Sequence, residues 1–152
     1  LVAPENFHIT LSFLDDQPEH TLHALHEALT EIDLPAFQLQ IKGVDVFGGA
    51  KPRLLWAGVS PSDQLSNLRK QVRSAAKTAG IDLRAEKFRP HITLARFRRD
   101  LRPETSERLA QFLSHHAQFA PPEIAVKTFT LYQSTLTEAG PIYGPLADYA
   151  LK

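Results

Sequence analysis

The sequence predicts an α+β fold of two pseudo-symmetric lobes, built from duplicated β-α-β units with antiparallel sheets around a central cleft. Three observations predict it. Segments with alternating and helical apolar spacing follow one another along the chain, the order strand, helix, strand occurs twice, and one short strand sequence recurs in both copies. The 152 residues, 43% of them hydrophobic, fit one bilobal domain over positions 1–152.

The elements of the first copy follow from their spacing. His8 to Leu14 alternates between polar and apolar residues, which predicts a strand. Pro18 to Ile32 carries leucines at helical intervals, and proline suits the first turn of a helix. Phe37 to Phe47 places Phe37, Leu39 and Ile41 on one face, so it reads as a strand that two glycines end.

The second copy is preceded by a further strand and helix. Leu54 to Val59 is a short apolar run that predicts a strand. Ser62 is a helix cap, and the helix continues to about Ala79 before a glycine stops it. The second copy then supplies a strand at His91–Phe97, a helix at Pro103–His115 and a strand at Ile124–Tyr132, followed by a last strand at Ile142–Tyr149.

The two copies share a motif. His8-Ile9-Thr10-Leu11 in the first strand is repeated as His91-Ile92-Thr93-Leu94 in the second. The second copy has a strand and a helix before its motif, whereas only seven residues precede the first motif here. Repeat arithmetic therefore predicts a further strand and helix upstream of Leu1, on the order of 30 residues.

Composition excludes several classes. Cysteine is absent, which rules out a disulfide framework, a thiolate nucleophile and cysteine metal sites. No apolar run reaches the ~20 residues that cross a bilayer, so we expect no membrane contact. The lack of cysteine is compatible with the cytoplasm, where we expect the protein to be a monomer. Basic and acidic residues number 17 each, yet seven basic residues gather between Arg84 and Arg102, where they could attract phosphate.

The repeated motif carries the chemistry. Because side chains alternate along a strand, each motif presents a histidine and a threonine on one face and apolar groups on the other. One imidazole, neutral near pH 7, can take a proton from water while the other, protonated, supplies one to a leaving oxygen. The hydroxyls of Thr10 and Thr93 can bind non-bridging phosphate oxygens. The pattern predicts cleavage of a cyclic phosphodiester without metal or cofactor.

Other residues are weaker candidates. Arg96 is five residues from His91, so on a regular strand it faces the opposite side, and a bend or bulge would be needed to turn it toward the cleft. Phe7 and Tyr132 are the aromatic candidates for stacking a base. A metal site among the histidines of the first helix is not favoured, because leucines occupy its buried face and no acidic or cysteine partner completes it.

At these motifs the chain resembles the 2H phosphoesterase superfamily, and within it the RNA 2′,3′-cyclic phosphodiesterases, also described as 2′-5′ RNA ligases. The resemblance implies the bilobal fold and metal-independent hydrolysis of the cyclic phosphate, in RNA or a nucleotide, to a 2′-phosphomonoester. It also implies that His8 is the general acid and His91 the general base, with Thr10, Thr93 and Arg96 on the phosphate. The matching segments are Val2–Leu14, Leu54–Val59, Phe88–Phe97 and Thr128–Ser134.

Two alternatives remain open at this point. The first is an enzyme of the same superfamily that performs 2′-5′ ligation or cleaves another cyclic or 2′-5′ linked nucleotide. The second is a non-catalytic module that binds a nucleotide through the same residues. Substrate panels separate the first alternative from the leading interpretation, and tight binding without turnover would favour the second.

Overall fold

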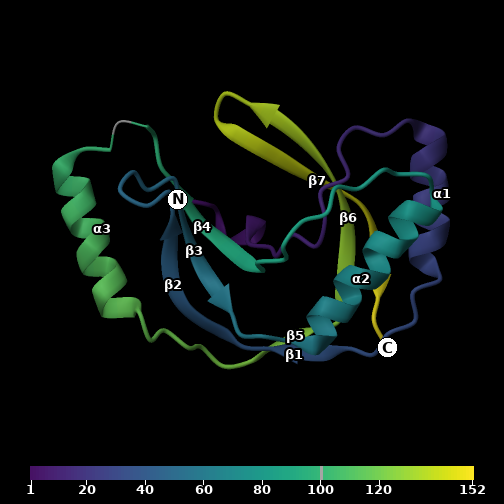
Figure 1. The fold of residues 1–152 in the computed structure, drawn as a ribbon, viewed down its shortest axis with the longest axis horizontal. Helices are drawn as coiled ribbons and strands as arrows, with labels where there is room; N and C mark the ends of the chain where they lie inside the picture. Colours follow the sequence, from purple (N-terminus) through teal and green to yellow (C-terminus); the bar gives the residue numbers. More distant parts are fainter. Residues whose placement is uncertain (100) are drawn as a thin grey trace. The chain divides into compact units, whose positions relative to one another are not determined.

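The computed structural model describes residues 1–99 and 101–152 and contains three α-helices and short antiparallel sheets (Figure 1). This confirms the predicted α+β class. Contacts divide the chain into two compact units, one of residues 1–10, 39–61 and 89–124, and one of residues 11–38, 62–88 and 125–152. Each copy of the repeat therefore contributes to both units. No helix in the described residues is long and apolar enough to cross a membrane.

A three-stranded antiparallel sheet forms the first unit. Its order is β2 (Ile41–Phe47), β3 (Leu54–Val59) and β4 (His91–Arg96), and α3 (Pro103–His116) contacts β2 (Figure 1). One face of the sheet packs against α3 through an apolar cluster. Its members are Leu55, Ala95 and Leu109, with Val46, Leu94, Phe97 and Leu113 around them. The opposite face of β4 carries polar side chains, among them those of His91 and Thr93.

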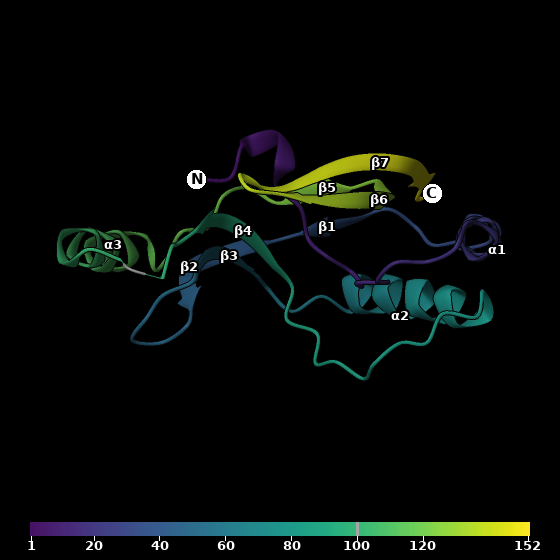
Figure 2. The ribbon, with the colours of Figure 1, turned by 90° about the horizontal axis from the view of Figure 1, so that it is seen from above.

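The second unit joins two helices to a β-hairpin. Helices α1 (Glu19–Thr30) and α2 (Asp63–Thr78) contact each other (Figure 2), and α1 also contacts β7 (Gly140–Ala150), the partner of β6 (Thr128–Thr137). The cap predicted for α2 is confirmed, because the hydroxyl of Ser62 accepts a hydrogen bond of 3.1 Å from the amide of Leu65.

Two predicted strands are each divided by one residue. The first divides at Gln40 into β1 (Phe37–Leu39) and β2, and the second at Lys127 into β5 (Ile124–Val126) and β6. The pieces pair with different partners, since β1 joins β5 whereas β2 joins β3. The side-chain amide of Gln40 donates 2.8 Å hydrogen bonds to two carbonyls, those of residues 41 and 121, which holds the break in place.

The strand predicted at residues 8–14 is largely wrong. Only Ile9 pairs, through an isolated antiparallel bridge to Ile92. A short 3₁₀ turn, Pro4–Asn6, precedes it, and the amide of Val2 donates to the carbonyl of Leu94 at 2.9 Å. Alternation predicts which way side chains point, but a strand also needs a partner for its backbone. No described strand pairs with residues 11–14, so they stay irregular.

Candidate active site

The two motifs lie side by side in the first unit. Because Ile9 opposes Ile92 in an antiparallel pair, the register sets His8 across from Thr93 and Thr10 across from His91. Directly opposed Cβ atoms lie about 4.5–5.5 Å apart, and diagonal neighbours such as the two histidines about 7–8 Å. All four side chains are half-buried. The register therefore places the two imidazoles and the two hydroxyls on one face of this pair.

This arrangement refines what the repeat predicted. The duplication suggested that two polar faces meet across a cleft, but both motifs belong to one unit and pair directly through Ile9 and Ile92. An antiparallel pair of strands has its own local two-fold axis. At the bridge of Ile9 with Ile92, this local axis exchanges His8 with His91 and Thr10 with Thr93.

Each histidine is oriented by its own backbone. Nδ1 of His8 lies 2.6 Å from the carbonyl oxygen of Asn6, and Nδ1 of His91 lies 2.8 Å from that of Arg89. A carbonyl only accepts, so Nδ1 carries the hydrogen in both rings. In the neutral form Nε2 then holds the lone pair, and in the charged form it holds a transferable proton. Either ring can act as acid or base from the same position.

A β-bulge brings Arg96 to the same face. Leu55 of β3 pairs with Ala95 and Trp56 pairs with Thr93, which leaves Leu94 as the extra residue on β4. Leu94 instead packs beside Ala95 in the apolar cluster. The bulge resets the alternation, so Arg96 points to the side of Thr93 rather than away from it. Arg96 therefore lies on the side of β4 that carries His91 and Thr93, and its contact with phosphate stays a prediction.

Two aromatic residues that the sequence did not single out pack around His91. Phe47 and Trp56 stack with ring centroids 5.0 Å apart. Phe47 meets the imidazole of His91 almost perpendicularly at 5.2 Å, and the indole lies 6.1 Å from it. Together with the Nδ1 hydrogen bond, these contacts restrict rotation of the ring and fix the direction of Nε2.

Gly58 makes this packing possible. It is the residue of β3 opposite His91, and a Cβ there would lie 2.6 Å from the carbonyl oxygen of Lys42 and 3.3 Å from Cζ3 of Trp56. We therefore expect Gly58→Ala to lower the free energy of unfolding by about 1–3 kcal/mol, the usual cost of overpacking. Chemical denaturation measures it.

Gly144→Ala is the matched control for that substitution. Gly144 also lies in a strand, β7, but no atom stands within 4 Å of the place that its Cβ would take. Its replacement should leave stability nearly unchanged or raise it slightly, because alanine has the lower conformational entropy when unfolded. Equal losses of stability in the two variants would contradict the close contact at Gly58.

The remaining candidates are distributed over both units. Phe7 belongs to the first unit and is 43% exposed, next to His8 in the chain. Tyr132 belongs to the second, where it packs edge-on against Tyr143 with centroids 6.3 Å apart. On α1, His26 bonds to the hydroxyl of Tyr149 at 2.8 Å. Within the described residues, no three His, Asp or Glu side chains form a group suited to a metal.

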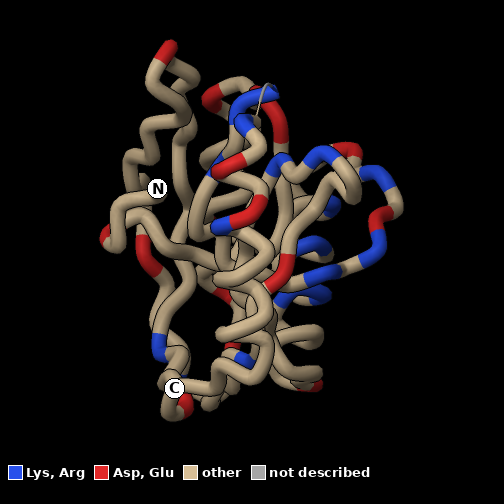
Figure 3. The backbone as a smooth tube through the Cα atoms, turned by 90° about the vertical axis from the view of Figure 1, so that its left-hand side faces the viewer, with Lys and Arg blue, Asp and Glu red and all other residues tan. Residues whose placement is uncertain are grey.

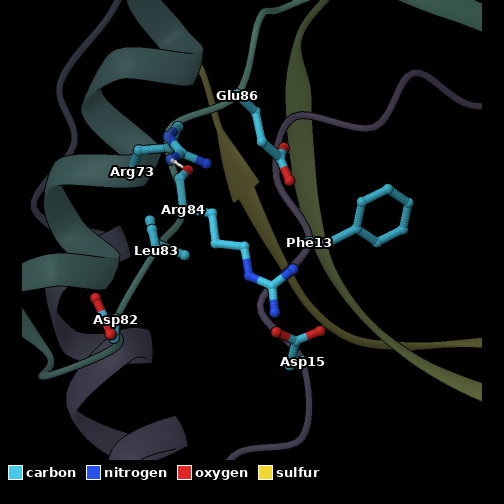
Figure 4. Close-up of a pocket in the computed structure, with 7 residues that line it drawn as sticks. All are labelled: Phe13, Asp15, Arg73, Asp82, Leu83, Arg84 and Glu86. Atoms are coloured by element: carbon cyan, nitrogen blue, oxygen red, sulfur yellow. Dashed lines mark hydrogen bonds between the residues drawn. The ribbon is translucent and has the colours of Figure 1, made fainter.

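The second unit contains a pocket of about 330 Å³. The guanidinium of Arg73 in α2 donates a hydrogen bond of 3.0 Å to the hydroxyl of Ser12. It also donates to the carbonyl of Arg84, as Figure 4 shows. Arg69, one turn earlier, donates to the carbonyl of Glu86 and covers the ring of Phe88. Burial and then Arg73 lower the pKa of the Arg69 guanidinium, whereas Glu86 raises it. These arginines anchor the segment that leads to Arg89 and the second motif. The pocket is lined by Phe13, Asp15, Arg73, Asp82, Leu83, Arg84 and Glu86.

Comparison with known proteins finds a matching family and several relatives. The profile of the 2′-5′ RNA ligase superfamily matches residues 2–138. The RNA 2′,3′-cyclic phosphodiesterase of Thermotoga maritima is 36% identical over 150 residues, which cover 97% of this chain and 76% of that protein. The protein of the same name from Archaeoglobus fulgidus is 36% identical over 146 residues, covering 95% and 80%.

Solved structures are similar over the same extent. Escherichia coli LigT complexed with 3′-AMP superposes with a TM-score of 0.75 at 29% identity, covering 99% of this chain and 79% of that one. The protein TT0787 of Thermus thermophilus superposes with a TM-score of 0.74 at 26% identity, covering 99% and 80%.

Proposed function

Since the chain belongs to the 2′-5′ RNA ligase superfamily, we propose that it hydrolyses RNA 2′,3′-cyclic phosphate ends to 2′-phosphomonoesters. Relatives at 36% identity carry the name of that activity, and a similar solved protein binds 3′-AMP. One observation of this chain supports the proposal most. Its two histidines share a face and a tautomer, and each lies across from a threonine.

The residues divide the reaction between them. His91, as base, takes a proton from water through Nε2 while the water oxygen bonds to phosphorus. The bond between phosphorus and the 3′ oxygen breaks, and His8, as acid, donates its Nε2 proton to that oxygen. The 2′ oxygen keeps the phosphate. After the reaction the two histidines have exchanged protonation states, and solvent restores them. Both proton transfers thus come from side chains of a single chain, without a metal ion.

The side chains of Thr10, Thr93 and Arg96 stabilise the negative charge on the phosphate. In the transition state the non-bridging oxygens carry the developing negative charge. The hydroxyls of Thr10 and Thr93 donate hydrogen bonds to them from the two paired segments, and the guanidinium of Arg96 adds a fixed positive charge from beyond the bulge. The near two-fold symmetry of the face suits the two equivalent non-bridging oxygens.

The test is product identification. We expect the protein, incubated with a nucleoside 2′,3′-cyclic phosphate and excess chelator, to form a 2′-monoester that phosphorus NMR distinguishes from the 3′-monoester. Loss of turnover on adding chelator would overturn the metal-free mechanism. Binding of the cyclic nucleotide without turnover would point to a binding module, and conversion only of 2′-5′ linked RNA would point to a different reaction of the family.

A further inference from the structure

Five basic residues gather at one end of the sheet in the first unit, and we call this group the basic end. Register and hydrogen bonds place them together, since Leu54 pairs with Arg96 and the amide of Phe97 donates to the carbonyl of Arg53 at 2.9 Å. All five side chains are exposed. The group consists of Lys51, Arg53, Arg96, Arg98 and Arg99, which Figure 3 colours among the basic residues.

The turn between β2 and β3 is shaped to present two of these residues. The amide of Lys51 donates to the carbonyl of Gly48 at 3.1 Å, and the amide of Arg53 donates to that of Phe47 at 2.8 Å. A Cβ at Gly48 would collide with the carbonyl oxygen of Lys51, and the backbone there has a φ of 111°. The tight turn brings Lys51 and Arg53 to the end of the sheet where β4 also finishes.

These charges have no ion-pair partner within the protein's described residues. Ion pairs there join His23 to Glu19 and Lys152 to Asp33, and none involves the basic end. The arginines of α2 differ, because Arg69 and Arg73 donate hydrogen bonds to carbonyls that they hold in place. Like charges kept together without counterions repel one another, and a bound polyanion relieves that repulsion.

The basic end continues the face of the candidate active site. The bulge at Leu94 turns Arg96 to the side of His91 and Thr93. Arg96 lies five positions after His91 along β4, a span of about 16 Å. A single cyclic nucleotide whose phosphate lies between the histidines needs only the near end of this face. A chain of phosphodiesters can follow it to Arg98 and Arg99.

We propose that the basic end binds the RNA backbone upstream of the cyclic phosphate, so that RNA oligonucleotides are preferred over cyclic mononucleotides. The inference rests on the proposed function and adds to it the surface that binds the RNA chain outside the candidate active site. The cations contact phosphates and read no base, so the preference depends on length and salt rather than on sequence.

The experiment compares Arg98→Glu and Arg99→Glu with Arg108→Glu. Arg108 is an exposed arginine of α3 in the same unit and outside the basic end, so it is matched in type, exposure and charge change. We expect the first two variants to lower kcat/KM several-fold for a short RNA ending in a 2′,3′-cyclic phosphate. Turnover of the cyclic mononucleotide should be unchanged, and Arg108→Glu should affect neither substrate.

Salt dependence gives the second measurement. The slope of log kcat/KM for the RNA against log salt should become shallower by roughly 0.7 for each phosphate that the variant no longer neutralises. Equal effects of Arg98→Glu and Arg108→Glu, or equal reductions with mononucleotide and RNA, would overturn the inference. If the unaltered protein cleaves neither substrate, the proposed function fails instead, and anisotropy with a labelled RNA that ends in a 3′-phosphate still tests the surface by binding.

Discussion

Replacing His8 with alanine should lower kcat by about 10²–10⁴-fold, and replacing His91 should do the same, because each removes one proton transfer. The double variant should be only slightly slower than either single variant, since an acid without its base gains little. Steady-state hydrolysis of a nucleoside 2′,3′-cyclic phosphate measures all three. The unaltered protein should show a bell-shaped pH profile, and each single variant should lose one limb.

His23→Ala is the control for those substitutions. His23 lies on the exposed surface of α1, 3.7 Å from Glu19, so its replacement should leave turnover unchanged. A variant at His8 or His91 that keeps near-normal kcat while remaining folded would exclude that residue from catalysis. If the loss of kcat in the double variant equals the product of the two single losses, the two histidines act independently. That result would contradict a mechanism in which they work as an acid–base pair.

Thr10→Val and Thr93→Val should each lower kcat by about 10²–10³-fold, the usual cost of one hydrogen-bond donor to a charged transition state. Valine keeps the branched shape of threonine, so the reduction in kcat reports the loss of the hydroxyl. KM for the cyclic phosphate should change little, because the hydroxyls bind most strongly when the charge on the oxygens is greatest. Initial rates over a range of substrate concentrations separate the two constants.

Thr128→Val tests whether the substitution itself is harmful. Thr128 begins β6 and is exposed, so its replacement should not change kcat. A rise in KM with unchanged kcat at Thr10 or Thr93 would mean that the hydroxyl binds substrate and transition state equally. In that case the threonines would be ordinary binding residues, and Arg96 would be the main candidate for stabilising the transition state.

Much of the site was predictable because it depends on local order in the chain. A repeated His-x-Thr pattern predicts two similar faces wherever the backbone is extended, because side chains alternate there. That condition holds along β4, and in the first motif at the bridge of Ile9 with Ile92. The helices were predicted for the same reason. Leu25 and Leu68 fall on the apolar faces of α1 and α2 and are almost fully buried.

What the sequence missed depends on pairing between distant segments. The break at Gln40 and the bulge at Leu94 arise where neighbouring strands impose a register, which hydrophobic alternation within one strand does not encode. The packing of Phe47 and Trp56 on His91 depends on how the turn between β2 and β3 aligns these two strands. It also depends on the absence of a side chain at Gly58. Aromatic residues in two strands signal a core, and nothing in their spacing singles out a histidine.

The stacked indole has an experimental use, because Trp56 is the only tryptophan in the chain. Its ring lies 6.1 Å from His91, and its Nε1 atom is shielded from solvent. An imidazolium quenches indole emission by accepting an excited electron, whereas neutral imidazole does so weakly. The protein therefore carries a natural optical reporter in its first unit, through which the proton occupancy of one histidine can be followed without any label.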